Sequence, residues 1–344
     1  MRLSAVHVAA ALLAVSLAPC LHAQEAPSPG GPPPASDAPN LQVEHQDDIQ
    51  TIKTGTTLVN MYFSVRDKQG FITNLHKDDC DLYENKDLQT IKNFTQEKNL
   101  PLTIGILLDT SGSQQNVLPL EQESGATFLK EVLTPKDEAF LISFDINVDL
   151  LSDYTSSPRE LKRAIDKAQI NTGAGTGSMT GHGQARGTLL FDAVYLAAHD
   201  KLRQEAGRKI LVLLTDGGDQ GSQETLKTAT EAAQKANAII YVILIADRGF
   251  YGGMSIGYSG DRDMEKLATD TGGRVINVGN NGKKLEDAFA QIQDELRTQY
   301  LLSYTPTNLK LDGTFRTLNL SCGKGYKVQT RKGYYAIAGD DNQN

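Results

Sequence analysis

The sequence of 344 residues contains no tryptophan, three cysteines and only 6% aromatic residues. Three cysteines are too few for a disulfide-dense small scaffold or for a zinc site made of four thiolates. So low an aromatic content argues against a platform on which nucleic-acid bases stack. Positive charge is also scarce, because 34 lysines and arginines face 42 aspartates and glutamates, which gives a net charge of −8. We therefore expect no nucleic-acid partner, since such binding depends on neutralising phosphates.

Long apolar runs are absent except near the start of the chain. A basic second residue, an apolar stretch over residues 6–18 and a small residue at Ala23 predict a secretory signal peptide over residues 1–23. The stretch is too short to span a bilayer comfortably, so we expect no transmembrane span. We expect the mature protein to be secreted, periplasmic or bound at the cell surface. Lipidation at Cys20 is the alternative to cleavage after Ala23, although the preceding proline departs from lipid-acceptor motifs.

Hydrophobic residues make up 39% of the chain, which is enough for a packed core, and the length predicts about two domains. Residues 24–40 contain six prolines and predict an extended linker. Short runs of β-forming residues fill residues 41–99 and return over residues 299–338. The simplest arrangement is a small β-sandwich-like domain made from both ends of the chain, with a second domain inserted between them.

Residues 100–298 differ in pattern, because nearly continuous apolar runs alternate there with amphipathic segments. The apolar runs are typical of strands buried on both faces, and they lie at residues 103–108, 140–144, 210–214 and 239–245. Apolar residues at three-four spacing predict helices at residues 121–133, 158–168, 190–202, 223–236 and 283–296. Strands that alternate with helices predict an α/β domain with a Rossmann-like, doubly wound, mostly parallel sheet.

Two of the predicted strands end in loops that are rich in carboxylates and hydroxyls. The first loop is Asp109-Thr110-Ser111-Gly112-Ser113, and the second contains Thr215-Asp216. In open parallel sheets, ligands bind beyond the carboxyl ends of the strands. Carboxylate and hydroxyl oxygens are hard ligands that suit Mg²⁺ or Mn²⁺ better than zinc or copper. The two loops together predict a divalent-cation site, whereas the first loop alone is equally typical of a helix cap.

The first loop resembles the Asp-x-Ser-x-Ser signature of von Willebrand factor type A domains. That family holds a cation in a metal-ion-dependent adhesion site, which also needs a threonine just before a helix and an aspartate after a later strand. Gly187-Thr188-Leu189 and Leu214-Thr215-Asp216 match these two positions, and the resemblance covers residues 102 to about 297. It implies that three hydroxyls bind Mg²⁺ or Mn²⁺ directly and that two carboxylates act mainly through water. The five residues so implied are Asp109, Ser111, Ser113, Thr188 and Asp216.

The resemblance implies adhesion-type protein binding without enzyme activity. One coordination position of the cation stays open, and in the family an Asp or Glu carboxylate of the protein partner fills it. A second interpretation is a structural component of a periplasmic or surface complex that assembles without metal. A hydrolase is less favoured, because the sequence lacks a His-Glu-x-x-His motif and the pair of motifs that an aspartic protease needs. The sequence indicates neither the partner nor the oligomeric state.

Cys80 and Cys322 remain as a pair once the signal peptide, which carries Cys20, is removed. In the oxidising compartment that export implies, we predict that they form a disulfide, and two buried thiols are the alternative. The flanks also resemble a bacterial branch of exported proteins with this domain, through residues 78–85 and 331–335. A cysteine at position 80 is less usual in that branch, which fits a pairing role with Cys322.

Two loops beside the expected metal site remain open to interpretation. Residues 171–187 are rich in glycine and precede Thr188, so they form either a solvated surface loop or a rim that selects the partner. Within them we expect His182 to be solvated rather than a metal ligand. Residues 247–263 predict either a second loop at the edge of the site, with Phe250, Tyr251 and Tyr258 as contacts, or a disordered segment.

Overall fold

The structure is a computed structural model that describes residues 58–97, 100–171, 187–245 and 259–337. The predicted signal peptide with Cys20, the linker over residues 24–40 and the start of the segment 41–99 lie outside the described residues. No helix in the described part is long and apolar enough to cross a membrane. All described residues belong to one unit, Gly55–Asn344.

A six-stranded sheet forms the centre of the inserted α/β part. Its strands are β5 (Leu102–Asp109), β6 (Glu138–Phe144), β7 (Val148–Thr155), β8 (Arg208–Thr215), β9 (Ala238–Leu244) and β10 (Val275–Asn277). The strand order is β10-β9-β8-β5-β6-β7, and all neighbours are parallel except β6 and β7. Every residue of β5, β8 and β9 is buried, as their continuous apolar runs predict. The predicted mostly parallel sheet is confirmed.

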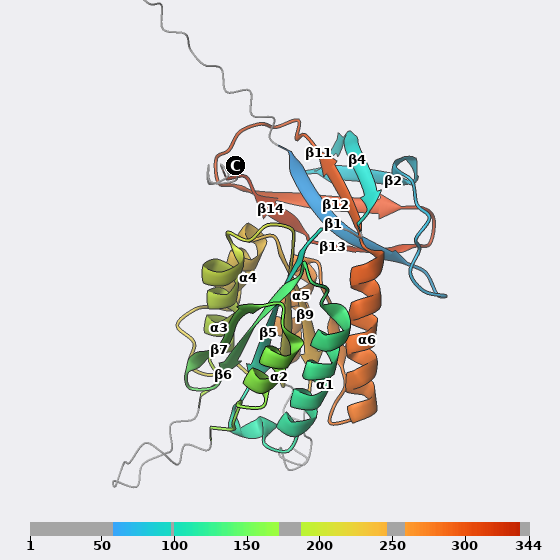
Figure 1. The fold of residues 1–344 in the computed structure, drawn as a ribbon. Helices are drawn as coiled ribbons and strands as arrows, with labels where there is room; N and C mark the ends of the chain where they lie inside the picture. Colours follow the sequence, from blue (N-terminus) through green and yellow to red (C-terminus); the bar gives the residue numbers. More distant parts are fainter. Residues whose placement is uncertain (1–57, 98–99, 172–186, 246–258, 338–344) are drawn as a thin grey trace, which may run out of the picture. The chain divides into compact units, whose positions relative to one another are not determined.

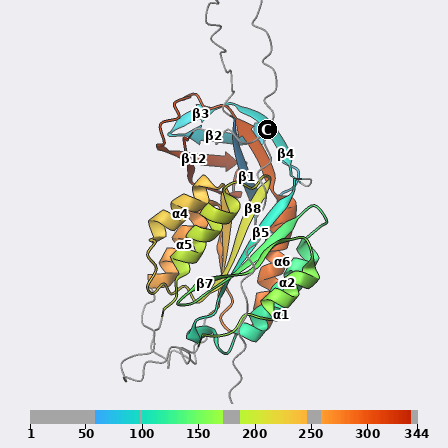
Figure 2. The same ribbon diagram turned by 60° about the vertical axis from the view of Figure 1, so that its left-hand side comes forward.

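Helices cover both faces of this sheet (Figures 1 and 2). One face shares a core with α1 (Leu118–Val132), α2 (Pro158–Ile165) and α6 (Gly282–Thr298). The other face shares a core with α3 (Leu190–Leu196), its π-helical extension η3 (Ala197–Leu202), α4 (Leu226–Lys235) and α5 (Ser259–Thr271). This is the doubly wound arrangement that the sequence predicts.

Two elements differ from the expectation. The pattern over residues 247–263 predicts a loop, but α5 begins at Ser259, and Met264, Leu267 and Ala268 bury one face of it completely. The edge strand β7 is also unexpected, because its mixture of exposed and half-buried residues makes no continuous apolar run. Neither element carries the continuous apolar pattern that marks the central strands.

Helix starts follow local signals in the sequence. The Ser157 side chain accepts a hydrogen bond from the backbone N–H of Glu160, and Pro158 occupies the first position of α2. Thr225 and Asn281 cap α4 and α6 in the same way. These caps satisfy backbone donors that a helix start leaves unpaired.

Strands from both ends of the chain form two further sheets, both antiparallel. One contains β1 (Val59–Arg66), β4 (Ile91–Gln96), β11 (Tyr300–Tyr304) and β13 (Lys327–Thr330). The other contains β2 (Cys80–Glu84), β3 (Asp87–Gln89), β12 (Phe315–Cys322) and β14 (Gly333–Tyr335). Met61, Phe63, Leu82, Leu302 and Leu320 belong to one buried core that both sheets share. The predicted β-sandwich-like unit made from both flanks is confirmed.

A disulfide joins Cys80 of β2 to Cys322 of β12. The two strands pair antiparallel, and the two cysteines lie directly opposite each other in the register. The predicted pairing is therefore confirmed. The bond connects a strand that precedes the α/β part to a strand that follows it.

Glu295 of α6 connects the α/β part to the antiparallel sheets. Its Oε1 accepts hydrogen bonds from Ser64 at 3.0 Å and from Gln329 at 2.6 Å, which belong to β1 and β13. The same oxygen accepts from the Tyr241 hydroxyl of β9 at 3.0 Å, and Arg274 donates to Oε2 at 3.0 Å. Since Glu295 is almost fully buried, this node fixes α6 against both parts of the protein.

Candidate metal centre

Asp109 and Asp216 meet where β5 and β8 end. The two strands are parallel neighbours, with Leu108 opposite Leu214, so the residues that follow lie side by side. The hydroxyl of Thr215 donates a hydrogen bond to Oδ2 of Asp109 at 2.7 Å. This edge lies at the end of the α/β part away from the antiparallel sheets (Figure 1). The structure thus joins the two acidic loops that the sequence places at strand ends.

The loop after β5 gathers hydroxyls around the Asp109 carboxylate. The backbone N–H of Ser111 donates to Oδ1 of Asp109 at 3.0 Å. The hydroxyl oxygens of Ser111 and Ser113 lie 3.0 Å apart. A 3-10 turn, η2 (Gly112–Gln114), follows Ser111 and turns the chain toward α1. The loop therefore presents two hydroxyl oxygens and a carboxylate in one place.

Two like charges oppose each other at this edge. Burial and the nearby charge of Asp216 raise the pKa of Asp109 from 3.8 to about 7, although the hydrogen bonds from Ser111 and Thr215 act in the other direction. Asp109 is fully buried and Asp216 nearly so. A divalent cation placed among these oxygens would cancel the repulsion and the cost of burying charge.

Glu121 adds a third carboxyl group, which the sequence analysis did not single out. It lies in the first turn of α1 and is 1% exposed. Burial, and then the charges of Asp109 and Asp216, raise the pKa of Glu121 well above its usual value. Neither carboxylate oxygen has a hydrogen-bond partner among the described residues. One signal was available: Glu121 follows Leu118 and precedes Gly125 and Phe128 at the spacing of the buried face of the helix.

Thr188 is held beside the loop after β8 by its backbone. Its N–H donates to the carbonyl of Gln220 at 2.9 Å, and the N–H of Gln220 donates back to its carbonyl at 2.9 Å. Thr188 is half-buried and stands two residues before α3 begins. Thr188 thus lies just before a helix start and pairs through its backbone with Gln220, in the segment that follows β8.

Asp145 ties the loops together and was also not singled out from the sequence. It follows β6, and its Oδ2 accepts from the hydroxyl of Thr110 at 2.9 Å, while the side chain of Asn171 donates to Oδ1 at 3.1 Å. Its backbone carbonyl accepts from the N–H of Leu189, next to Thr188, at 2.8 Å. Asp145 therefore connects the loop that carries Ser111 to the segment that carries Thr188.

These residues fit a hard divalent cation. Among the described residues, no three Asp, Glu, His or Cys side chains are close enough to hold an ion. The oxygens at this edge are instead hydroxyls mixed with carboxylates, which is the donor chemistry that Mg²⁺ accepts. The unpartnered oxygens of Glu121 also require a hydrogen-bond donor or a cation. The glycine-rich residues 172–186 with His182, and the aromatic residues of the loop 246–258, lie outside the described residues.

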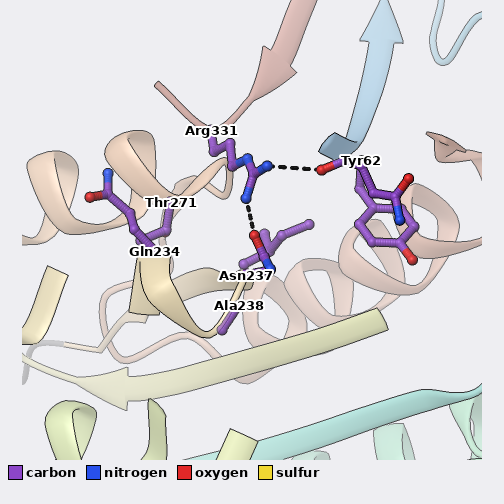
Figure 3. Close-up of a pocket in the computed structure, with 8 residues that line it drawn as sticks. Tyr62, Gln234, Asn237, Ala238, Thr271 and Arg331 are labelled. Carbon is purple, nitrogen blue, oxygen red and sulfur yellow. Dashed lines mark hydrogen bonds between the residues drawn. The ribbon is translucent and has the colours of Figure 1, made fainter. Parts of the chain in front are cut away.

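A pocket lies elsewhere, between the antiparallel sheets and the start of β9 (Figure 3). Its volume of about 20 Å³ suits one water molecule. Arg331 reaches from the β13–β14 connection to the Asn237 side chain, and it donates to the backbone carbonyl of Asn60 at 2.8 Å. Burial lowers the pKa of Arg331 to about 10. The lining residues are Asn60, Tyr62, Gln234, Asn237, Ala238, Ile239, Thr271 and Arg331. So small a space holds no substrate.

Solved structures with a similar fold include BatB from Bacteroides thetaiotaomicron, with 16% identity and a TM-score of 0.42, over 57% of this chain and 99% of that one. Proximal thread matrix protein 1 from the mussel byssus, in a form whose metal-ion-dependent adhesion site holds zinc, is 17% identical with a TM-score of 0.46, over 61% and 48% of the two chains. The vWF domain of the type V pili tip protein Mfa5 from Porphyromonas gingivalis is 14% identical with a TM-score of 0.44, over 58% of this chain and 96% of that one.

The family of this chain follows from its sequence rather than from these structural likenesses. A search of the curated proteins finds no match. The sequence model of the von Willebrand factor type A domain matches residues 104–291, which is more than half of the 344 residues. The match begins in β5 and ends in α6, so it spans both acidic loops and the sheet that positions them. This chain belongs to the von Willebrand factor type A domain family.

Proposed function

We propose that this chain is an exported protein-binding module that engages its partner through a bound Mg²⁺ or Mn²⁺. Von Willebrand factor type A domains are protein-interaction or adhesion-type modules and are generally not catalytic. The observation that carries the proposal is the pair of buried carboxylates, Asp109 and Asp216, beside the paired hydroxyls of Ser111 and Ser113. Burying these two carboxylates together costs folding free energy in the metal-free protein. A cation bound among the four side chains would offset that cost and create a binding site.

The five site residues would act on the cation in two ways, according to their side-chain chemistry. Ser111, Ser113 and Thr188 would hold the cation directly through their hydroxyls. Asp109 and Asp216 would act mainly through water, which keeps negative charge near the cation without quenching it. The bound cation would supply an electrophilic position that an Asp or Glu carboxylate of the partner fills. Asp145 supports this assignment, because it joins the Ser111 loop to the segment of Thr188.

Export is part of the same proposal. Residues 1–23 have the pattern of a signal peptide, and lipidation at Cys20 is the alternative to cleavage after Ala23. The disulfide between Cys80 and Cys322 supports an oxidising compartment, because disulfides persist mainly outside the cytosol. We therefore propose that the mature protein acts in the periplasm, at the cell surface or in the medium.

Metal binding comes first in the test. Isothermal titration of the mature chain with Mg²⁺ and with Mn²⁺ is expected to show binding by the unmutated protein. Asp109→Ala and Ser113→Ala are expected to abolish it. Ser321→Ala is the matched control, because Ser321 is exposed on β12, outside the metal-binding loops. Absence of binding by the unmutated protein would contradict the proposal.

Partner capture follows. The mature protein on beads is exposed to envelope extract and medium of the source cells, in Mg²⁺ and in chelator. A partner retained only in Mg²⁺, by the unmutated protein and Ser321→Ala but not by Ser113→Ala, is the expected result. A partner retained equally in all conditions would instead support the metal-independent structural component.

A further inference from the structure

Glu121 is a buried acid for which the described protein offers no hydrogen-bond donor. Its side chain lies under the first turn of α1, and its two carboxylate oxygens are both buried and unpartnered among the described residues. The charges of Asp109 and Asp216 both act on it, as the raised pKa of Glu121 shows. A buried carboxyl without a donor costs folding free energy. The Glu121 carboxyl therefore needs a hydrogen-bond donor from outside the described protein.

Gln114, in η2 before α1, also has a side-chain oxygen without a hydrogen-bond partner among the described residues. The N–H of Val117 donates to the Gln114 carbonyl, and the N–H of Glu121 donates to the Val117 carbonyl, so the two residues stand two turns apart. Gln114 is fully buried, and its side-chain nitrogen donates to the carbonyl of Ile245 at 3.4 Å. Its Oε1 has no partner among the described residues. The unpaired atoms of Glu121 and Gln114 are thus all acceptors, and each lacks a hydrogen-bond donor.

Water bound to a cation supplies such a donor. Glu121 does not complete a cluster of carboxylates around an ion, because no three acidic groups in the described chain are close enough to share one. Mg²⁺ keeps several of its waters when proteins bind it. Those waters are polarised by the cation and donate strong hydrogen bonds to carboxylates. Donors of this kind are what the three unpaired oxygens of Glu121 and Gln114 lack.

We propose that Glu121 is a positioning residue of the metal centre, whose carboxylate, like Gln114 Oε1, accepts hydrogen bonds from water bound to the cation. The inference rests on the function proposed above. It assigns the first turn of α1 to the outer layer of the site. It also explains why α1 keeps a charged side chain on its buried face: the carboxylate destabilises the metal-free protein but supports the bound cation.

Glu121→Gln tests the role, with Glu123→Gln as the matched control. Glu123 lies in the same helix but is exposed. Mg²⁺ affinity is measured by isothermal titration of the mature chain, and unfolding by urea is followed in chelator. We expect Glu121→Gln to weaken Mg²⁺ binding by about tenfold or more, in the range found when outer-layer partners of metal ligands are removed. In chelator, its stability should equal or exceed that of the unmutated protein, and Glu123→Gln should change neither quantity.

The results for Glu121→Gln distinguish a role at the metal centre from a purely structural role. A purely structural glutamate would lose stability in chelator on replacement by glutamine, and that result overturns the inference. So does Mg²⁺ affinity within about twofold of the unmutated protein, a change well below the usual outer-layer effect. Glu121→Met, an apolar side chain of similar length, repeats the comparison if the glutamine variant does not fold. If the unmutated protein binds no Mg²⁺, the proposed function fails as well, whereas normal binding with a silent variant removes only the role of Glu121.

Discussion

At the residue scale, Asp109 carries the electrostatic argument for the proposed metal site. Two hydrogen bonds, from the Ser111 N–H and the Thr215 hydroxyl, favour its charged form. Burial and the charge of Asp216 favour the neutral form, and they prevail, because the pKa of Asp109 rises to about 7. Local donors therefore orient the carboxylate without compensating its charge. What remains is an electrostatic cost that a divalent cation removes.

This cost predicts how the stability of the metal-free protein depends on pH. Folded Asp109 keeps its proton up to about pH 7, whereas the unfolded chain releases it near 3.8. Between these values the folded state binds more protons, so the free energy of unfolding falls as pH rises. The raised pKa of Glu121 acts in the same direction. Urea unfolding in chelator, repeated from pH 4 to pH 7, measures the slope.

Asp109→Asn is the control for this slope, because asparagine has no proton to release in this range. Its stability should fall less steeply with pH than that of the unmutated protein. Saturating Mg²⁺ should reverse the trend in the unmutated protein, since the cation binds the deprotonated site. Parallel pH profiles of the two proteins in chelator would contradict the assignment of the slope to Asp109.

The sequence identifies the residues of the Asp-x-Ser-x-Ser motif but not Glu121 and Asp145. Asp109, Ser111 and Ser113 stand in a short motif, so their association is local and visible in the sequence. Glu121 and Asp145 matter because of what the fold places around them, and a glutamate or aspartate at a helix start or turn is ordinarily solvated. No local pattern shows that the fold leaves the buried Glu121 carboxyl without a donor, or that Asp145 connects two loops.

At the element scale, the end of α5 depends on a close approach to the sheet. Gly272 has φ +94° and turns the chain at the helix end, and Gly273 follows with its N–H bonded to the carbonyl of Ala268 at 2.8 Å. A Cβ on Gly273 would lie 1.9 Å from the backbone carbonyl oxygen of Ile240 in β9. A side chain at this position would push α5 away from the central sheet.

Gly273→Ala is therefore expected to destabilise the protein by about 1–3 kcal/mol or more, the usual range for overpacking. Gly125→Ala in α1 is the contrast, because its Cβ would lie 3.5 Å from Ile165, an ordinary contact. That change should leave stability the same or raise it by up to about 1 kcal/mol, since alanine favours a helix over glycine. Urea unfolding of both variants decides; equal stabilities would refute the steric argument.

Continuous patterns made most elements predictable. The apolar runs of β5, β8 and β9 predict buried parallel strands, because only a strand covered on both faces carries such a run. The edge strand β7 was missed because its exposure alternates irregularly. Helix α5 was missed because its sequence follows a glycine-rich loop, and its buried face is set by the sheet beneath it. Tertiary burial, which is invisible locally, decides both cases.

At the scale of the whole molecule, strands that precede and follow the α/β part pair with each other in the antiparallel sheets. Strands β1 and β11, which come before and after the inserted residues, pair antiparallel, with Met61 opposite Leu302. Glu295 then joins α6 to both β1 and β13. The proposed metal centre lies where β5 and β8 end, at the end of the central sheet away from the antiparallel sheets (Figure 1). The antiparallel sheets therefore support the α/β part without contributing to the site itself.

The disulfide tests this division between support and site. Cys80 and Cys322 are separated by 242 positions in the sequence, so in the chain-entropy model their bond stabilises the fold by about 5 kcal/mol. Cys80→Ser with Cys322→Ser should lower the free energy of unfolding by an amount of this order, and a reducing agent should affect only the unmutated protein. Mg²⁺ affinity of the folded variant should stay unchanged, because the cysteines lie in the antiparallel sheets, far from Asp109. Weakened Mg²⁺ binding by a folded variant would show instead that the sheets act on the site, through the Glu295 node of α6.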